Sequence, residues 1–547
     1  MFFVKNRSFA LGRSLARHRH HDVATVVERK IQEESYVSSL RRSGSVKEVC
    51  DRHAEIVRDG YGQSVVLGDV LVQAYGKHGG IDKARVVFDG LGRKNAFSWT
   101  VLIAAYAQNG HPRQALGAFK AMDVKPSRYT YLVILGACSE LKALSDGRVI
   151  HSQILAAAAE LGDDVCLHNA VVNMYAKCGN LNDARAAFDA IPRKDVVSWN
   201  SMVSAYAQRG ESRLALELYH RMEPEGVKPD EYTFSSVLSA CSSYEEGREI
   251  HKAIVSSGTH SSNNAIQNAL IDMYTRCHRL VEAKEVFDRM QRKNVISWTA
   301  MISAYTQHDE GRQAVLLFRK MDLEGVVPNN VTFATVITAC SNEGMLAQGR
   351  AIHSRIRKPD FVVQNTLLNL YGKCGRLEEA RSVFEEMKFK SVITWTTLVA
   401  AYAQQGHSME ALELSRKMDL DGVLPNSVTF GCILVACSYG GLLDQGWTSF
   451  TSMLPDYGIE PAAEHYVCMV DVLGRAGRVF EAEDLVHSIP AERGPLGWLA
   501  LLGACRNQAD AERGTRAAHQ AYERYRKQSG LLVLLSDVFA RSEAAAQ

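Results

Sequence analysis

Apolar residues recur along this chain at helical spacing, in short stripes that are followed by glycine or proline. Residues 165–195 show the pattern, because one stripe is followed by Gly179 and a second by Pro192. The first stripe consists of Val171, Met174 and Tyr175, and the second consists of Leu181, Ala184, Phe188 and Ile191. This spacing places each stripe on one face of a helix, and glycine commonly ends helices. The segment therefore predicts two amphipathic helices that form an antiparallel hairpin.

The hairpin pattern repeats along the chain with a longer period of about 100 residues. The large residues that mark this period are Trp99, Trp199, Trp298, Trp395 and Trp498, with His53, His151, His251 and His353 and with Tyr75, Tyr175, Tyr274 and Tyr371. Each period exceeds one helix pair and contains three related segments. A single hairpin cannot bury its own apolar faces, so neighbouring hairpins must stack. We therefore predict an all-α fold, a right-handed superhelical solenoid of antiparallel helix-pair repeats with a long concave surface.

The segments fall into three kinds of unit, which form an array of about 14 repeats over residues 31–494. Short units occupy residues 65–95, 165–195, 264–294, 361–391 and 463–494. Tryptophan units occupy residues 96–127, 196–230, 295–329 and 392–426. Cysteine units occupy residues 128–164, 231–263, 330–360 and 427–462. A degenerate unit precedes them near residues 31–64, and the pattern changes after residue 494.

Composition supports a folded chain without a membrane span. Charged residues make up 23% and hydrophobic residues 46% of the sequence. The densest apolar run, residues 531–535, is far shorter than the roughly 18 residues that a bilayer requires. We therefore expect a soluble protein.

The first residues of the chain are basic and amphipathic. Arginine and lysine alternate with apolar residues there, and no acidic residue precedes Asp22. This pattern is typical of an organellar transit peptide, predicted over residues 1–30, and the alternative is a frayed basic terminus. Arginine outnumbers serine, which favours the mitochondrion over the chloroplast. Without the first 21 residues the net charge of +2 becomes about −3, so binding of a nucleic acid would depend on base contacts.

Eight of the twelve cysteines occur in register with the repeat. The residues that follow an alanine are Cys138, Cys241, Cys340, Cys437 and Cys505, and those that follow a lysine or arginine are Cys178, Cys277 and Cys374. No Cys-x-x-Cys pair occurs, and there is no secretory signal. We therefore predict small buried residues between helices rather than a disulfide framework or a metal site.

Several strings of residues resemble the pentatricopeptide repeat family. They are residues 173–181 (NMYAKCGNL), 196–202 (VVSWNSM) and 226–230 (GVKPD). The alternation of units is similar to the plant-type PLS subclass, and the resemblance covers about residues 36–547. Residues 456–477 resemble the last repeats of that subclass, and residues 498–506 (WLALLGACR) resemble its E motif, which we place at 495–547. The resemblance implies a solenoid that binds single-stranded RNA.

The competing solenoid is the tetratricopeptide repeat, which has a similar alanine and phenylalanine pattern but binds peptides. Polar residues decide between the two families. We expect asparagine or threonine just before the first helix of successive units, and aspartate, asparagine or serine at the unit ends. A peptide groove has no need for this arrangement, whereas an RNA-binding surface does.

The resemblance implies that the fifth and last residues of a unit together read one base. Pairs implied for uracil are Asn169 with Asp195 and Asn200 with Asp230. Asn268 with Asn294 implies a pyrimidine, Asn365 with Ser391 implies cytosine, and Thr299 with Asn329 and Thr396 with Asn426 imply adenine. Such side chains can meet the donors and acceptors of a base edge. For a single asparagine the alternative is a helix N-cap.

Second residues of units complete the implied site. Val197, Ile296 and Ile393 would sandwich the bases. At about 1 to 3 kcal/mol per stacked base, before ordering costs, six to eight units would support tight binding without a basic patch.

Some units depart from the family pattern. Asp69, paired with Asn95, is an acid where an amide or hydroxyl is expected, and Thr100 and Ser127 belong to a unit that is about three residues short. Val467 with Gly494 offers almost no polar group. The fifth residues of three cysteine units, Leu132, Ala334 and Gly431, are apolar, so these units are predicted to space the RNA. The implied readout is U-U-n-Y-A-n-C-A.

No catalytic or cofactor signature accompanies the repeats. His53-Ala54-Glu55 matches the His-x-Glu part of a zinc deaminase signature but has no Cys-x-x-Cys partner and coincides with the periodic histidine. We therefore predict no enzyme activity, no cofactor and no metal. No phosphate-binding glycine loop occurs either.

The resemblance implies a site-recognition factor for C-to-U editing of organellar RNA, with a deaminase and editing factors recruited in trans through residues 495–547. The second helix pair of the E region, from Leu531, lacks its partner helix, which indicates a docking surface or a truncated sequence. One alternative is a passive RNA-binding protein that stabilises, processes or activates a transcript. The other is a protein-interaction scaffold, which predicts no selective RNA binding.

Overall fold

The computed structural model describes residues 29–162, 164–258, 263–489, 495–508 and 510–524. All regular secondary structure in these ranges is helical, as the sequence predicts. The chain divides into two compact units, Met1–Ala269 and Leu270–Gln547. No helix in the described ranges has the length and apolarity needed to cross a membrane.

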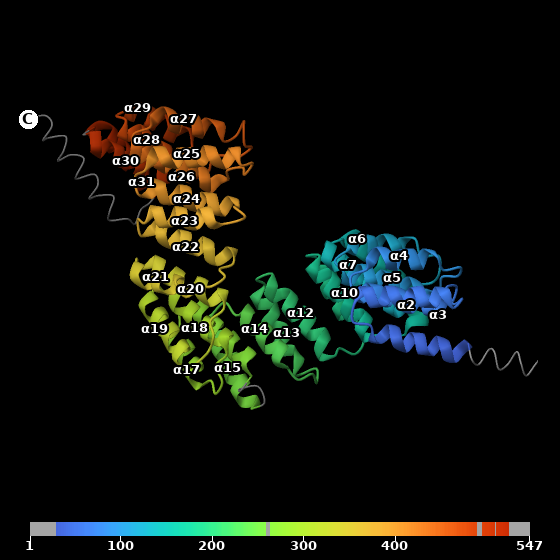
Figure 1. Cartoon of the computed structure of the whole chain (residues 1–547). Helices are drawn as coiled ribbons and strands as arrows, with labels where there is room; N and C mark the ends of the chain where they lie inside the picture. The colour runs from blue at the N-terminus through green and yellow to red at the C-terminus, as the bar shows by residue number, and fades with distance from the viewer. Residues whose placement is uncertain (1–28, 163, 259–262, 490–494, 509, 525–547) are drawn as a thin grey trace, which may run out of the picture. The chain divides into compact units, whose positions relative to one another are not determined.

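The first compact unit, drawn in blue to green in Figure 1, consists of consecutive helix pairs after a helix over residues 29–42 and α2 (Val46–Arg58). The first helices of its pairs are α3 (Val65–Lys77), α5 (Ala96–Gln108), α7 (Arg128–Leu141), α10 (Val165–Lys177), α12 (Val196–Gln208) and α14 (Glu231–Ala240). The second helices are α4 (Ile81–Asp89), α6 (Pro112–Lys120), α8 (Leu144–Ala156), α11 (Leu181–Asp189), α13 (Ser212–Met222) and α15 (Tyr244–Ser257). Short α9 (Ala158–Leu161) follows α8, and α16 (Asn264–Arg276) contains the boundary between the compact units.

The second compact unit repeats the same design, and its yellow to red helices form a regular stack in Figure 1. Its first helices are α18 (Val295–Gln307), α20 (Asn330–Asn342), α22 (Phe361–Lys373), α24 (Val392–Gln404), α26 (Ser427–Gly440), α28 (Ala463–Arg475) and α30 (Pro495–Gln508). Its second helices are α17 (Leu280–Arg289), α19 (Gly311–Leu323), α21 (Leu346–His353), α23 (Leu377–Glu386), α25 (Ser408–Leu420), α27 (Leu443–Ser452), α29 (Val479–Ser488) and α31 (Ala511–Arg524).

Within each compact unit the helices form two layers. Each first helix packs against the first helix of the next pair, from α3 to α14 and again from α18 to α30. Each also packs against its own second helix, as α10 does against α11 and α24 against α25. The predicted all-helical solenoid of stacked hairpins is confirmed.

Local sequence explains where the helices end and how closely they pack. Helix α10 ends at Lys177, and Gly179 follows with φ +87°, a conformation that glycine adopts without strain. Where the first helices α22 and α24 meet, a Cβ at Gly372 would lie only 2.6 Å from the Cβ of Ala401. Glycine at this position therefore permits close packing of α22 against α24.

The tryptophan period has a packing explanation. Four of the periodic tryptophans lie at the start of a first helix and meet a phenylalanine of the preceding pair edge-on, whereas Trp498 meets His487. Centroid distances are 4.8 Å for Trp99 with Phe88, 5.0 Å for Trp199 with Phe188, 5.0 Å for Trp298 with Phe287 and 4.7 Å for Trp395 with Phe384. Such edge-to-face pairs stabilise the contact beyond burial of area alone. The tryptophans thus join each short unit to the tryptophan unit after it.

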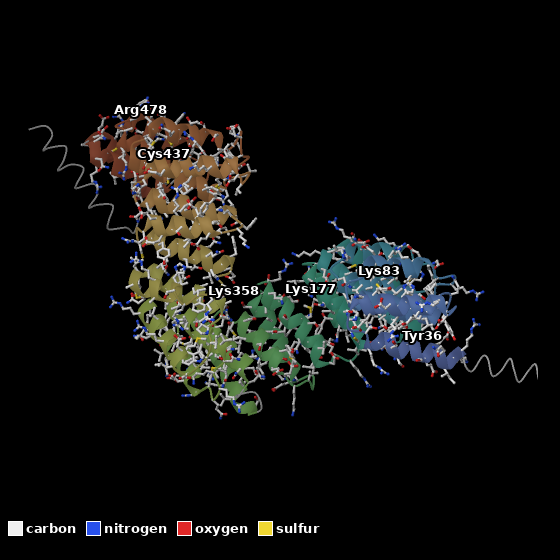
Figure 2. All side chains as sticks on the ribbon, viewed as in Figure 1. Tyr36, Lys83, Lys177, Lys358, Cys437 and Arg478 are labelled. Atoms are coloured by element: carbon white, nitrogen blue, oxygen red, sulfur yellow. The ribbon has the colours of Figure 1, made fainter. Side chains whose placement is uncertain are left out.

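The predicted burial of the periodic cysteines is confirmed for the five that follow an alanine, including Cys437, which is labelled in Figure 2. Cys178, Cys277 and Cys374, which follow a lysine or arginine, are only partly buried. Burial raises the pKa of the Cys138 and Cys340 thiols to about 12 and that of Cys437 to about 11. The described ranges hold no group of three or more histidine, cysteine and acidic side chains placed to bind a metal ion.

The periodic histidines bind the periodic tyrosines. His53 Nδ1 lies 3.1 Å from the Tyr75 hydroxyl, and His151 Nδ1 lies 3.0 Å from that of Tyr175. His353 and Tyr371 form the same bond at 2.7 Å. Burial lowers the pKa of His53, His151 and His353. These bonds join the end of one triplet to the start of the next.

This contact predicts a pH-dependent stability. Above the unfolded histidine pKa of about 6.5, the neutral ring is stable in both states. As pH falls below this value, the unfolded chain binds protons before the folded chain, so stability is lost. His151→Phe should lower the local stability of α10 by about 1 kcal/mol at about pH 7.5 and by less at about pH 5.

Native-state hydrogen exchange of the α10 amides measures this, since repeat arrays open in parts. Replacement of the exposed His220 by phenylalanine is the control. An equal loss at both pH values would contradict the role assigned to the His151 ring.

Candidate functional site

The last residue of eight units caps the first helix of the next unit with the same hydrogen bond. Its side-chain oxygen accepts the backbone N–H of the third residue of that helix, at 2.8 to 3.4 Å. The capping residues are Asn95, Ser127, Asp195, Asp230, Asn294, Asn329, Ser391 and Asn426. The helix-cap interpretation of these residues is therefore correct, and the bond fixes their position relative to the next unit.

The third residue of each capped helix was missed by the sequence analysis. In the eight helices capped by these residues it is a serine or threonine, and its hydroxyl lies beside the cap. These residues are Ser98, Thr130, Ser198, Thr233, Ser297, Thr332, Thr394 and Thr429, and each is at most 1% exposed. The signal in the sequence is a serine or threonine three positions after each of these eight unit ends.

The fifth residues lie in a different place from the one expected. The sequence analysis placed them just before the first helix, but the structure places each one turn inside it. They are Thr100, Asn169, Asn200, Asn268, Thr299, Asn365 and Thr396, on α5, α10, α12, α16, α18, α22 and α24. The expectation was wrong because the preceding residue already occupies the capping position, so the helix begins with the first residue of the unit.

Fifth and last residues meet directly in the first compact unit. Asn169 Nδ2 donates to Asp195 Oδ1 at 3.1 Å, and Asn200 Nδ2 donates to Asp230 Oδ1 at 2.9 Å. The Thr100 and Ser127 hydroxyls lie 3.4 Å apart.

Both aspartates are ionised at neutral pH. Burial by itself would raise the pKa of Asp195 and Asp230. The hydrogen bonds from Ser198 and Asn169 to Asp195, and from the Thr233 backbone N–H and the Asn200 amide to Asp230, outweigh burial and hold each pKa below its ordinary value. The two side chains therefore act only as acceptors.

In the second compact unit the fifth residues Thr299 and Thr396 do not contact the capping residue directly. Each contacts a buried threonine, which in turn donates to the capping residue. The Thr299 hydroxyl lies 2.7 Å from that of Thr332, which donates to Asn329 Oδ1 at 2.9 Å. Thr396 and Thr429 also lie 2.7 Å apart, and Thr429 donates to Asn426 Oδ1 at 3.0 Å.

The pair of Asn365 and Ser391 is not joined in this way. Asn365 Nδ2 donates to the Phe361 carbonyl at 2.9 Å, while the Ser391 hydroxyl lies 3.3 Å from that of Thr394. Asn268 belongs to the first compact unit and Asn294 to the second.

The cap determines which polar atom each last residue presents. In Asn329 and Asn426 the Oδ1 atom accepts the capping N–H, so the Nδ2 group is the one left to donate outward. In Asp195 and Asp230 the Oδ1 atom is used, so the second carboxylate oxygen is left to accept. Asparagine and aspartate at this position therefore offer opposite hydrogen-bonding groups to a ligand.

The fifth residues of the short units carry unsatisfied acceptors. The Oδ1 atoms of Asn169, Asn268 and Asn365 are buried and have no hydrogen-bond partner. One carboxylate oxygen of Asp69, at the same position, is also unpartnered, and burial raises the pKa of this acid. A buried polar atom left unpaired costs about 1 to 3 kcal/mol of stability.

The second residues form an exposed apolar row beside these groups. Val197, Ile296 and Ile393 have 53%, 61% and 61% of their surface exposed. The row also includes residues that the sequence analysis did not name, which are Val66, Phe97, Tyr129, Tyr232, Val331, Val362 and Val428. We call the second, fifth and last residues of consecutive units, in each compact unit, the capped edge.

A cavity interrupts the capped edge at one cysteine unit. It has a volume of about 370 Å³, and its lining includes Ser427, Val428, Gly431 and Cys468. Gly431 is the fifth residue of its unit, and a Cβ there would meet no atom within 4 Å. The missing side chain therefore leaves open space at the position where other units place a polar group.

Comparison with protein families gives repeated matches along the chain. Residues 194–243, 293–342 and 390–438 match the PPR repeat family. Residues 97–125, 166–196, 268–295, 365–392 and 464–492 match the PPR repeat.

Curated relatives extend these matches over most of the chain. A mitochondrial pentatricopeptide repeat-containing protein of Arabidopsis thaliana is 33% identical, over 93% of this chain and 60% of the relative. A chloroplastic one is 34% identical, over 89% of this chain and 61% of the relative. A third from the same plant is 34% identical, over 90% of this chain and 72% of the relative. This chain thus spans about 60% of the length of the first two relatives.

Solved structures share the fold at low identity. The pentatricopeptide repeat protein PPR10, in complex with an 18-nucleotide RNA element, has a TM-score of 0.65 and 16% identity. The match covers 97% of this chain and 81% of PPR10. A second structure, of PPR10 from maize, has a TM-score of 0.61 at 17% identity. The likeness shows that the fold is a helical repeat solenoid.

The capping role of the edge predicts a stability change that requires no ligand. Asn426→Ala removes the acceptor for the Thr429 N–H and should lower the local stability of α26 by about 1 kcal/mol, whereas Asn426→Asp should retain it. Hydrogen exchange at the start of α26 measures the effect. Equal protection in the alanine and wild-type proteins would show that this cap is dispensable.

Proposed function

Because the chain belongs to the pentatricopeptide repeat family, we propose that it binds one stretch of single-stranded organellar RNA along its capped edge. The observation that carries the proposal is the set of unpartnered, buried Oδ1 atoms on Asn169, Asn268 and Asn365. A folded protein retains such atoms at a cost, and a ligand with a matching donor removes that cost.

Base chemistry fits these acceptors. Uracil carries a donor at N3 and cytosine carries one at N4, and the three short units with free Oδ1 atoms are those for which the family implies pyrimidines. The apolar row beside them supplies surfaces on which bases stack, as Val197 and Ile393 would. One base per reading unit gives the gapped register U-U-n-Y-A-n-C-A from the amino-terminal side.

The tryptophan units of the second compact unit favour a different base. Asn329 and Asn426 have donor groups left over after capping. The Watson-Crick edge of adenine offers an acceptor at N1. Thr299 and Thr396 lie at the corresponding fifth positions, so the pairs suit adenine.

The further proposal is that RNA binding selects a site for C-to-U editing. Residues 456–506 resemble the last repeats and E motif of the editing subclass. We propose the division into a transit peptide at 1–30, a PLS-type array at 31–494 and an E motif at 495–547, which would recruit a deaminase in trans. One of the relatives above is mitochondrial and another chloroplastic, and we propose the mitochondrion.

Asn329→Asp tests the base-reading assignment. The substitution keeps the capping oxygen but replaces the outward donor by an acceptor, which suits the N1 and N2 donors of guanine. Selection from a randomised RNA pool should therefore change one position from A towards G, with the other positions unchanged.

Asn342→Asp is the matched control, since it adds the same charge at the other end of α20. Unchanged selectivity in Asn329→Asp would refute the code assignment. A wild-type chain that selects no sequence would instead favour a protein-interaction scaffold.

Loss of the gene tests the editing proposal. Sequencing of organellar transcripts should find one or a few C-to-U sites unedited, with U-U-n-Y-A-n-C-A upstream of each. If every site stays edited while transcript ends or translation change, the chain is a passive RNA-binding protein.

A further inference from the structure

The third-position threonines that follow tryptophan units bind the fifth residue of the unit before them. Hydroxyl distances are 2.6 Å for Thr130 with Thr100, 2.7 Å for Thr332 with Thr299 and 2.7 Å for Thr429 with Thr396. Thr233 Oγ1 donates to Asn200 Oδ1 at 2.6 Å. All four threonines are fully buried. A side chain of one unit therefore holds the proposed base-reading residue of another.

Short units lack this contact even where a buried threonine follows. Thr394 follows Asn365, is fully buried and lies 3.3 Å from the Ser391 hydroxyl, yet Asn365 Oδ1 has no partner. Ser198 follows Asn169 and donates to Asp195 at 2.8 Å, and Asn169 Oδ1 is again unpartnered. A third residue can therefore bond to the capping residue without contacting the fifth residue of the unit before it.

Asn169 and Asn200 belong to identical Asn–Asp pairs but are held differently. The Asn200 amide makes two bonds, from Nδ2 to Asp230 and to Oδ1 from Thr233. Rotation of this amide by half a turn would place its oxygen against the ionised Asp230 and remove both bonds. The Asn169 amide is held only by its bond to Asp195. Asn200 is therefore fixed before any ligand binds.

We propose that Thr233 is a positioning residue that sets how strongly the unit at 196–230 discriminates between bases. The inference rests on the proposed RNA-binding function. A fixed amide presents one remaining hydrogen and one remaining lone pair in set directions, so a base with the wrong edge cannot be accommodated by rotation. The unit at 165–195, whose amide is held by one bond instead of two, discriminates less although its code pair is the same.

Thr233→Val tests the proposal because valine keeps the shape and loses the hydroxyl. From the RNA that wild-type protein selects, four RNAs are made that differ only at the nucleotide of Asn200. Preference for uracil over cytosine should fall by about two- to tenfold at this nucleotide, which corresponds to the ordering cost of one side chain. Preference at the nucleotides of Asn169 and Asn365 should not change, and Thr233→Ser should restore the wild-type ratio.

Thr394→Val is the matched control. It removes a hydroxyl that is equally buried and equally part of a cap, but one that does not touch Asn365. Both valine variants should lose similar thermal stability, and only Thr233→Val should lose selectivity. If Thr233→Val does not fold, Thr429→Val gives the same test at the nucleotide of Thr396.

Two results would overturn the proposal. One is an unchanged uracil preference in folded Thr233→Val. The other is an equal loss of selectivity at the Asn365 nucleotide in Thr394→Val, which would mean that the cap alone acts. A wild-type chain without any RNA selectivity would instead remove the proposed function itself.

Discussion

The hydrogen bond from a third-residue N–H to the last side chain of the preceding unit determines both the fold and the candidate site. At Asp195 and Ser198 this bond measures 2.8 Å, and it starts α12 at Val196. Once the helix starts there, its geometry places the second residue outward, the third inward and the fifth one turn further on. The polar groups of two successive units then meet at one point. A cap contributes only about 1 kcal/mol, so its main consequence here is positional.

Stacking has to support side chains that lower stability. Asn169, Asn268, Asn365 and Asp69 each leave a buried oxygen unpaired. Contacts between neighbouring helix pairs offset this loss of stability. Examples are the edge-to-face packing of Trp199 on Phe188 and the hydrogen bond between His151 and Tyr175. In a repeat protein such contacts extend only to adjacent units. A substitution at one interface should therefore disturb the polar groups of the units on either side more than those far along the chain.

The sequence predicted what depends on short-range periodicity. Apolar stripes located the helix pairs, Gly179 marked the end of α10, and the register of Cys138 and Cys437 correctly indicated burial. Errors and omissions arose where two units meet. The fifth residues were placed outside the helix because the capping position had not been assigned to the preceding residue. Thr332 was overlooked because its spacing from the unit end indicates only a cap, whereas its contact with Thr299 lies across the interface between two units.

The orientation of the amides was beyond any sequence argument. Asn169 and Asn200 have the same type of partner at the unit end, yet one oxygen is unpaired and the other accepts a threonine hydroxyl. Which of these occurs depends on the third residue of the next unit and on the geometry of the helices between them.

The identities of the fifth and last residues of each unit are therefore an incomplete description of the capped edge. The net charge is only +2 over the whole chain, so in the proposed function bulk attraction to phosphates is weak and the buried amides and hydroxyls would supply selectivity. The number of hydrogen bonds that hold each of these side chains within the protein differs from unit to unit. Amides with one bond and a free oxygen gain most from a ligand donor, whereas amides with two bonds lose least entropy on binding. Short units and tryptophan units should thus contribute to recognition in different ways, the first through affinity and the second through discrimination.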